Sequence, residues 1–170
     1  MRILQGNKYV GAGMMFFMLA ANGKANMTTT ALWDFINDIS ASVKQMTVNN
    51  VTQSSLGFTL VKENPEVNFY QAKTLNLHDS GKAEHFDLRL SKAPDGVKPF
   101  LSFSWRGECF SLDTIKQHYP QLGLTGVPRG RSENEMTSYT TPADKDKQTI
   151  TFSFKANKPD CLSRVIIRGK

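Results

Sequence analysis

The sequence predicts an α+β domain, in which a mainly antiparallel sheet of about six strands carries two to three helices on one face. Two observations predict it. Segments with apolar residues at helical spacing are followed by groups of segments in which apolar and polar residues alternate one by one. A short helix and three strands are followed by the same series, at a period of about 60 residues. The halves share negligible sequence identity, so we expect two architectural pseudo-repeats.

Residues 1–25 are expected to form a secretory signal peptide. A short basic start precedes an uncharged apolar stretch, Val10–Ala21, and small residues suited to signal peptidase follow at Gly23 and Ala25. A membrane-spanning helix needs about 20 apolar residues, and this stretch is shorter. We therefore expect cleavage near Gly23 or Ala25 and a single exported domain, residues 26–170, with no membrane span in its mature form.

Three segments of the mature chain have helical patterns. In "TTTALWDFINDISASVKQM", Leu32, Ile36 and Ile39 recur at helical spacing after threonines able to cap a helix. "TVNNVTQSSLG" stops at Gly57, where a glycine is expected just past a helix, but it is the weakest helical segment because of its threonine, serine and asparagine content. "SLDTIKQHY" offers Ser111 as the cap of a third helix.

Six segments are predicted as strands: "EVNFYQAKTLNL", "EHFDLRLS", "KPFLSFSW", "MTSYTT", "QTITFSFK" and "LSRVIIR". In "EHFDLRLS" the apolar residues alternate with His85, Asp87 and Arg89, and in "FLSFSW" they alternate with serines. Strands buried on one side only indicate an antiparallel sheet with a solvated face. The residues expected to face the helices are Phe86, Leu88, Leu90, Leu101, Phe103, Trp105, Ile150, Phe152, Phe154, Val165 and Ile167.

Charge and motif content exclude several classes of function. Without residues 1–25 the chain has 18 bases (21 less three) against 15 acids, so the formal charge falls from +6 to +3. The bases are scattered among acids rather than gathered in a stripe, which argues against nucleic acid. The sequence contains no glycine-rich phosphate loop, metal-ligand cluster or nucleophile elbow. We therefore expect no cofactor, no metal site and no catalytic residues.

The two cysteines, Cys109 and Cys161, are interpreted as a disulfide, because an even pair in an exported chain is usually oxidised. The alternative is a reactive Cys109 thiol. That reading needs a neighbouring base such as His118, which the sequence does not place beside it. The histidines His78, His85 and His118 have spacings typical of no local metal motif.

The stretch "VPRGRSENEM" is the main candidate for a binding loop. It carries Arg129, Arg131, Glu133 and Glu135 within a connection longer than is usual in a compact domain. Its balanced charge suits a complementary protein surface better than a polyanion. Contact with a partner, internal salt bridges that order the loop, and binding of a small anion or catalysis remain open.

A second candidate surface is the solvated row of His85, Asp87 and Arg89 on the predicted strand "EHFDLRLS". These three side chains have the chemistry of an acid, an orienting group and an anion clamp. A solvated strand face explains the same period-two pattern with fewer assumptions. Because the row is expected to be a solvated, charged surface, we assign it to partner binding, together with the loop.

The second half of the chain resembles a known group of proteins. "GECFSLDTIKQHYPQL", "PRGRSENE", "TFSF" and "NKPDCLSRVII" are similar, in this order, to small signal-peptide-bearing periplasmic immunity-type proteins of Gram-negative bacteria, associated with type VI secretion effectors. The resemblance covers roughly Gly107 to Ile167. Its most specific part is the Pro-Arg-Gly loop combined with the Asp160-Cys161-Leu162 ending.

The resemblance implies a periplasmic protein that is not an enzyme, and that binds a cognate secreted effector enzyme and blocks its attack on the cell wall. Two other interpretations stay open. One is a periplasmic envelope- or peptidoglycan-binding or assembly module, and the other is a small hydrolase that uses His85 and Asp87.

Overall fold

The computed structural model describes residues 32–77 and 81–169. The expected signal peptide and His78 lie outside the described residues. The helices are α1 (Leu32–Gln45), the 3-10 turn η1 (Val51–Gln53) and α2 (Leu112–His118). The strands are β1 (Thr59–Glu63), β2 (Val67–Gln71), β3 (Leu75–Leu77), β4 (Gly81–Ser91), β5 (Phe100–Gly107), β6 (Gly123–Gly126), β7 (Met136–Thr140), β8 (Thr149–Lys155) and β9 (Lys158–Arg168).

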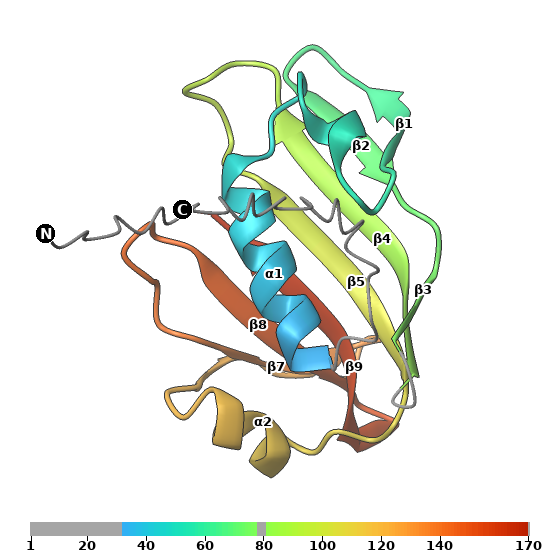
Figure 1. The fold of residues 1–170 in the computed structure, drawn as a ribbon. Coiled ribbons are helices and arrows are strands. Elements are labelled where there is room, and N and C mark those ends of the chain that lie inside the picture. The colour runs from blue at the N-terminus through green and yellow to red at the C-terminus, as the bar shows by residue number, and fades with distance from the viewer. Residues whose placement is uncertain (1–31, 78–80, 170) are drawn as a thin grey trace, which may run out of the picture.

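The strands form one antiparallel sheet in the order β1-β2-β4-β5-β9-β8-β7-β6, and β3 also pairs with β4 (Figure 1). The predicted α+β class and the antiparallel arrangement are confirmed. The expected number of strands is wrong, because the described part of the sheet has nine strands where about six were expected.

The additional strands lie where the sequence carries no alternating pattern. The edge strand β1 is exposed along its whole length, and β6 is a four-residue edge strand with a glycine at each end. β2 and β3 were expected as one strand, but they pair with opposite ends of β4, on either side of a bulge between Glu84 and Asp87. The bulge is in the pairing of β4 with β5, and β2 and β3 pair with the parts of β4 on either side of it, so the segment expected as one strand is divided in two.

Two of the three helical segments form α-helices. α1 begins the described chain, and α2 is capped by Ser111, whose hydroxyl accepts a hydrogen bond from the Thr114 backbone N–H group at 3.1 Å. The segment after α1 forms only the turn η1. Its serine, threonine and asparagine side chains compete for backbone hydrogen bonds, which shortens it.

The core lies between α1 and one face of the sheet (Figure 1). The ring of Phe35 meets Phe86 and Phe103 edge to face, with centroids 6.3 Å and 5.4 Å apart. The expected core residues are buried, with Ile150 only partly so. Fully burying one such side chain stabilises the fold by about 1.5–3 kcal/mol. The apolar residues of the strands therefore face α1, and their polar residues lie on the opposite face of the sheet.

Candidate functional site: an open sheet face and a projecting hairpin

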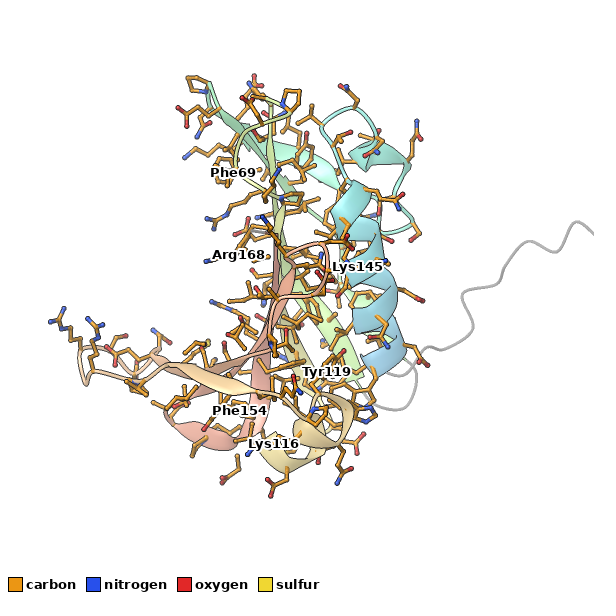
Figure 2. All side chains as sticks on the ribbon, turned by 90° about the vertical axis from the view of Figure 1, so that its left-hand side faces the viewer. Phe69, Lys116, Tyr119, Lys145, Phe154 and Arg168 are labelled. Carbon is orange, nitrogen blue, oxygen red and sulfur yellow. A yellow bond between two sulfur atoms is a disulfide. The ribbon has the colours of Figure 1, made fainter. Side chains whose placement is uncertain are left out.

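The sheet face opposite α1 has no helix on it among the described residues. In Figure 2, α1 lies on one side of the sheet while Phe69 and Arg168 lie on the other. The hairpin of β6 and β7 extends from the body toward this same side. We call this surface the open face, and the loop between the two strands, residues 127–135, the hairpin loop.

An alternating row of cations and aromatic rings crosses five strands of the open face. Lys62, Phe69, Arg89, Phe100 and Arg168 are consecutive cross-strand partners on β1, β2, β4, β5 and β9. The cationic groups lie 5.7, 5.6, 4.8 and 5.3 Å from the ring centroids along this series. These distances are within the range of cation–π attraction, which holds the long side chains against the sheet. We call this series the cation–aromatic row.

Sequence reasoning found only Arg89 of this row. The row depends on the pairing of five strands, one of which, β1, carried no strand signal. Cross-strand register is set by bulges and turns that a single sequence does not reveal. The signal that could have indicated this row was the position of Phe100, which shares the polar side of a predicted strand with serines.

Asp87 and Arg89 form an ion pair within the open face. The Arg89 guanidinium donates to the Asp87 carboxylate with an Nη2–Oδ2 distance of 2.6 Å. The hydrogen bond with Asp87 is the main cause that raises the pKa of Arg89. Both groups therefore have a partner already, which leaves neither free as an acid or a clamp in this arrangement.

His85 does not continue the alternation that the sequence suggested. It lies in the β4 bulge with a φ of 55°, and Glu84 takes the open-face position instead, opposite Ser104. Glu84 is buried by cationic neighbours, with Arg106 Nε at 2.9 Å and Lys82 Nζ at 3.6 Å. Sequence reasoning missed Glu84 because a bulge shifts every preceding residue to the opposite face.

The hairpin loop is ordered by its own glutamate. The Glu135 carboxylate accepts hydrogen bonds from the backbone N–H groups of Arg129, Gly130 at 2.9 Å and Arg131 at 3.0 Å. Gly130 has a φ of 75°, the left-handed conformation that lets successive N–H groups converge on one anion. Partial removal from water raises the pKa of Glu135, but these backbone hydrogen bonds outweigh it and the pKa is lowered.

This arrangement leaves the two arginine side chains of the loop without an ion-pair partner among the described residues. Neither the Arg129 nor the Arg131 side chain makes an ion pair within the described residues, and both are exposed. Glu135 is occupied by the backbone, so Glu133 is the exposed acid of the loop. The loop was expected to be electrically balanced, and internal salt bridges were one way to order it. The loop keeps its balance of two arginines and two glutamates, but its order comes from backbone donors rather than from salt bridges.

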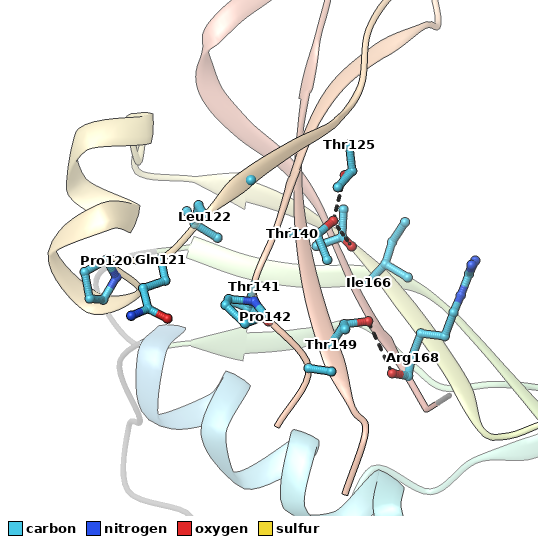
Figure 3. A pocket seen from close by; sticks show the side chains of 13 residues that line it. Pro120, Gln121, Leu122, Thr125, Thr140, Thr141, Pro142, Thr149, Ile166 and Arg168 are labelled. Carbon is cyan, nitrogen blue, oxygen red and sulfur yellow. Dashed lines mark hydrogen bonds between the residues drawn. The ribbon is translucent and has the colours of Figure 1, made fainter. Parts of the chain in front are cut away.

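A groove lies on the open face beside the hairpin (Figure 3). It has a volume of about 830 Å³ and is bounded by the segments Pro120–Gly123 and Thr141–Ala143. Threonine hydroxyls form part of its wall, and Arg168 lies at one end. The hydroxyls of Thr125 and Thr140 are 2.7 Å apart, and those of Thr140 and Thr151 are 2.8 Å apart.

The disulfide between Cys109 and Cys161 is confirmed. Their Cα atoms are 4.8 Å apart, and the bond ties the segment before α2 to β9. A backbone hydrogen bond from Leu162 to Phe110, 2.9 Å long, runs beside it. Cys109 is therefore not a thiol nucleophile here, and the His118 ring stacks on Trp33 instead, with centroids 4.2 Å apart.

The described residues contain no group of three or more histidine, cysteine, aspartate or glutamate side chains arranged to hold a metal ion. None of the helices that the structure describes is long and apolar enough to cross a membrane. A comparison with models of protein families, with curated proteins and with solved structures finds no significant match for this chain.

Proposed function

We propose that this chain is a periplasmic immunity-type protein that binds a secreted, cell-wall-targeting effector enzyme and blocks it. The observation that carries the proposal is the hairpin loop, which is held in one conformation by Glu135 and presents Arg129 and Arg131 without carboxylate partners among the described residues. It projects on the same side as the open face, so loop and sheet offer one continuous surface to a partner (Figure 2).

The loop has the physical properties that an inhibitor needs. A segment that is ordered before binding loses little conformational entropy when the complex forms. Arginine is among the residues that contribute most to binding at protein interfaces, because its guanidinium donates several hydrogen bonds and packs flat on other groups. Val127, 58% exposed, adds an apolar side chain at the base of the same loop.

Two further features support export and an immunity role. The disulfide fits a protein that folds in an oxidising compartment, since such bonds are rare in the cytosol. The resemblance of residues 107–167 to periplasmic immunity-type proteins includes the Pro-Arg-Gly loop itself, which is the part that projects.

A second candidate function is an envelope-binding module that recognises peptidoglycan. The groove favours it, because threonine hydroxyls and the exposed amide of Gln121 provide hydrogen-bonding groups for a sugar or peptide chain. The hydrolase reading has no such support, since Asp87 is paired with Arg89. We therefore propose no reaction for this chain.

Co-purification tests the proposal. The protein is expressed in the periplasm together with a candidate effector, chosen from the genes that neighbour its own, and the complex is isolated under oxidising conditions. Cells in which that effector is directed to the periplasm should survive only when this chain is present. Equal killing with and without the chain, and no recovered complex, would contradict the immunity role. Retention on purified peptidoglycan in that case would favour the envelope-binding module.

A further inference from the structure

We propose that the groove beside Arg168 receives an extended, acidic segment of a protein partner, with one carboxylate bound by the Arg168 guanidinium. This inference rests on the proposed function, because it specifies the chemistry of the partner surface that the open face recognises. It concerns a site that lies apart from the hairpin loop in sequence and that the sequence patterns did not indicate.

Arg168 is held in place and has no anionic partner among the residues that the structure describes. Its guanidinium carbon lies 5.3 Å from the centre of the Phe100 ring, at the end of the cation–aromatic row. No carboxylate within the described residues forms an ion pair with it. A guanidinium packed over a ring keeps its N–H edge available for a two-pronged hydrogen bond with a carboxylate.

The surroundings of Arg168 favour an anion. The lining of the groove contains no aspartate or glutamate among the described residues. The open-face acids Glu84 and Asp87 are already paired with Arg106 and Arg89. An incoming carboxylate therefore meets unpaired positive charge, and no free acid of the groove repels it.

The residues of β9 on the open face indicate how the bound segment would run and which side chains it would carry. Arg164, Ile166 and Arg168 alternate on this face, opposite Ser104, Ser102 and Phe100. Arg164 is exposed and makes no ion pair with any described residue. Alternate residues of an extended chain are about 6.6 Å apart, so a segment lying along β9 would place an acid, an apolar residue and an acid at every second position.

The threonine wall suits an extended backbone. The Thr140 hydroxyl is hydrogen-bonded to the hydroxyls of Thr125 and Thr151. The donors and acceptors of this wall are therefore held in a row across β6, β7 and β8. Fixed polar groups beside an apolar Ile166 match a chain with alternating polar and apolar side chains. A polyanion such as nucleic acid would need a longer series of cations than the two arginines that flank Ile166.

A synthetic peptide tests the inference without the natural partner. The probe is acetyl-Gly-Glu-Thr-Val-Thr-Glu-Gly-amide, and its matched control has glutamine in place of both glutamates. Each is added to the ¹⁵N-labelled, oxidised mature protein while backbone amide shifts are followed. We expect the acidic peptide to shift the signals of Thr149, Thr151, Ile166 and Arg168, and the glutamine peptide to leave them unchanged.

Substitutions identify the group that recognises the carboxylate. Arg168→Gln should weaken binding of the acidic peptide by about tenfold, the usual effect of losing a charged hydrogen-bonded pair. Lys116→Ala, which removes an exposed cation on α2, should leave binding unchanged. Arg168→Lys should give an intermediate affinity, because it keeps the charge but loses the planar fork. If Arg168→Gln does not fold, Arg164→Gln serves as the second variant and should also reduce affinity.

Three results would overturn the inference: no shift with the acidic peptide, the same shifts with the glutamine peptide, or equal binding of a sulfated oligosaccharide at these residues. A recovered effector complex without peptide binding would reject this groove assignment and leave the immunity role intact. Peptide binding at Arg168 without any effector complex would support the groove and reject the immunity role.

Discussion

The carboxylate of Glu135 accepts a hydrogen bond from the backbone N–H group of Arg131, four residues earlier, at 3.0 Å. The same carboxylate also accepts from the backbone of Arg129 and Gly130. A single side chain therefore orders the segment that carries both arginines of the hairpin loop. The Glu135 carboxylate is bound to the backbone, and the Arg129 and Arg131 guanidinium groups have no ion-pair partner among the described residues.

Replacing Glu135 should loosen the loop without unfolding the domain. In Glu135→Ala the N–H groups of residues 129–131 lose their acceptor and turn to water, so we expect faster amide exchange and greater mobility confined to the hairpin loop. NMR relaxation and hydrogen exchange measure this. Glu133→Ala is the matched control, since Glu133 is exposed and lies two residues before Glu135 in the same loop. Equal loosening in both variants would show that Glu135 has no special role.

The loop should also respond to pH. Backbone hydrogen bonds lower the pKa of Glu135 in the folded protein. A group with a lowered folded pKa contributes stability above its unfolded pKa, about 4.3 for glutamate, and loses it as pH falls through the folded pKa. The amide shifts of Gly130 and Arg131 should thus stay constant from neutral pH to about pH 5 and move only below the unfolded pKa. In Glu135→Gln this transition should be missing, and a transition near neutral pH would contradict the assignment.

Breaking the disulfide should destabilise the whole domain. Cys109 and Cys161 are 52 residues apart, and closing a loop of that length stabilises a fold by about 4 kcal/mol on the chain-entropy model, as an upper value. Urea unfolding of the double variant Cys109→Ser/Cys161→Ser should show this loss. Reduction of the unsubstituted protein should give a similar decrease, whereas an unchanged midpoint would show that the bond constrains little.

The cation–aromatic row predicts a coupling between Phe100 and two arginines. Phe100→Leu removes the ring between Arg89 and Arg168, so stability should fall by about 1 kcal/mol and both guanidinium groups should become more mobile. Phe69→Leu is the control, because Phe69 contacts Arg89 but lies two strands from Phe100. NMR relaxation of the arginine Nε signals should therefore change for Arg168 only in Phe100→Leu.

Much of the fold could be predicted from local patterns. Phe86, Leu88 and Leu90 alternate with polar residues and are buried, and Ser111 caps α2, because side-chain period and capping chemistry act within a few residues. The edge strand β1 could not be predicted. Each of its residues is exposed, including Leu60 and Val61, so its sequence has no buried side to reveal.

The candidate site was predicted less completely, for a physical reason. Arg129, Arg131 and Asp87 were found as charged residues in polar segments, but their partners depend on backbone conformation and strand register. The positive φ of Gly130 brings three N–H groups to Glu135, and the bulge at His85 exchanges the face of Glu84. Neither feature follows from charge or spacing in one sequence.

The most direct test of the account is the affinity of the chain for the effector that co-purification identifies, measured by calorimetry with oxidised protein comprising residues 26–170. Arg129→Ala and Arg131→Ala should each cost about 2 kcal/mol, roughly thirtyfold in Kd, while the fold stays intact. Lys145→Ala, an exposed cation that Figure 2 places on the side of α1, should have no effect. Unchanged affinity in both arginine variants, or the same loss in Lys145→Ala, would contradict the claim that the hairpin loop is the binding element.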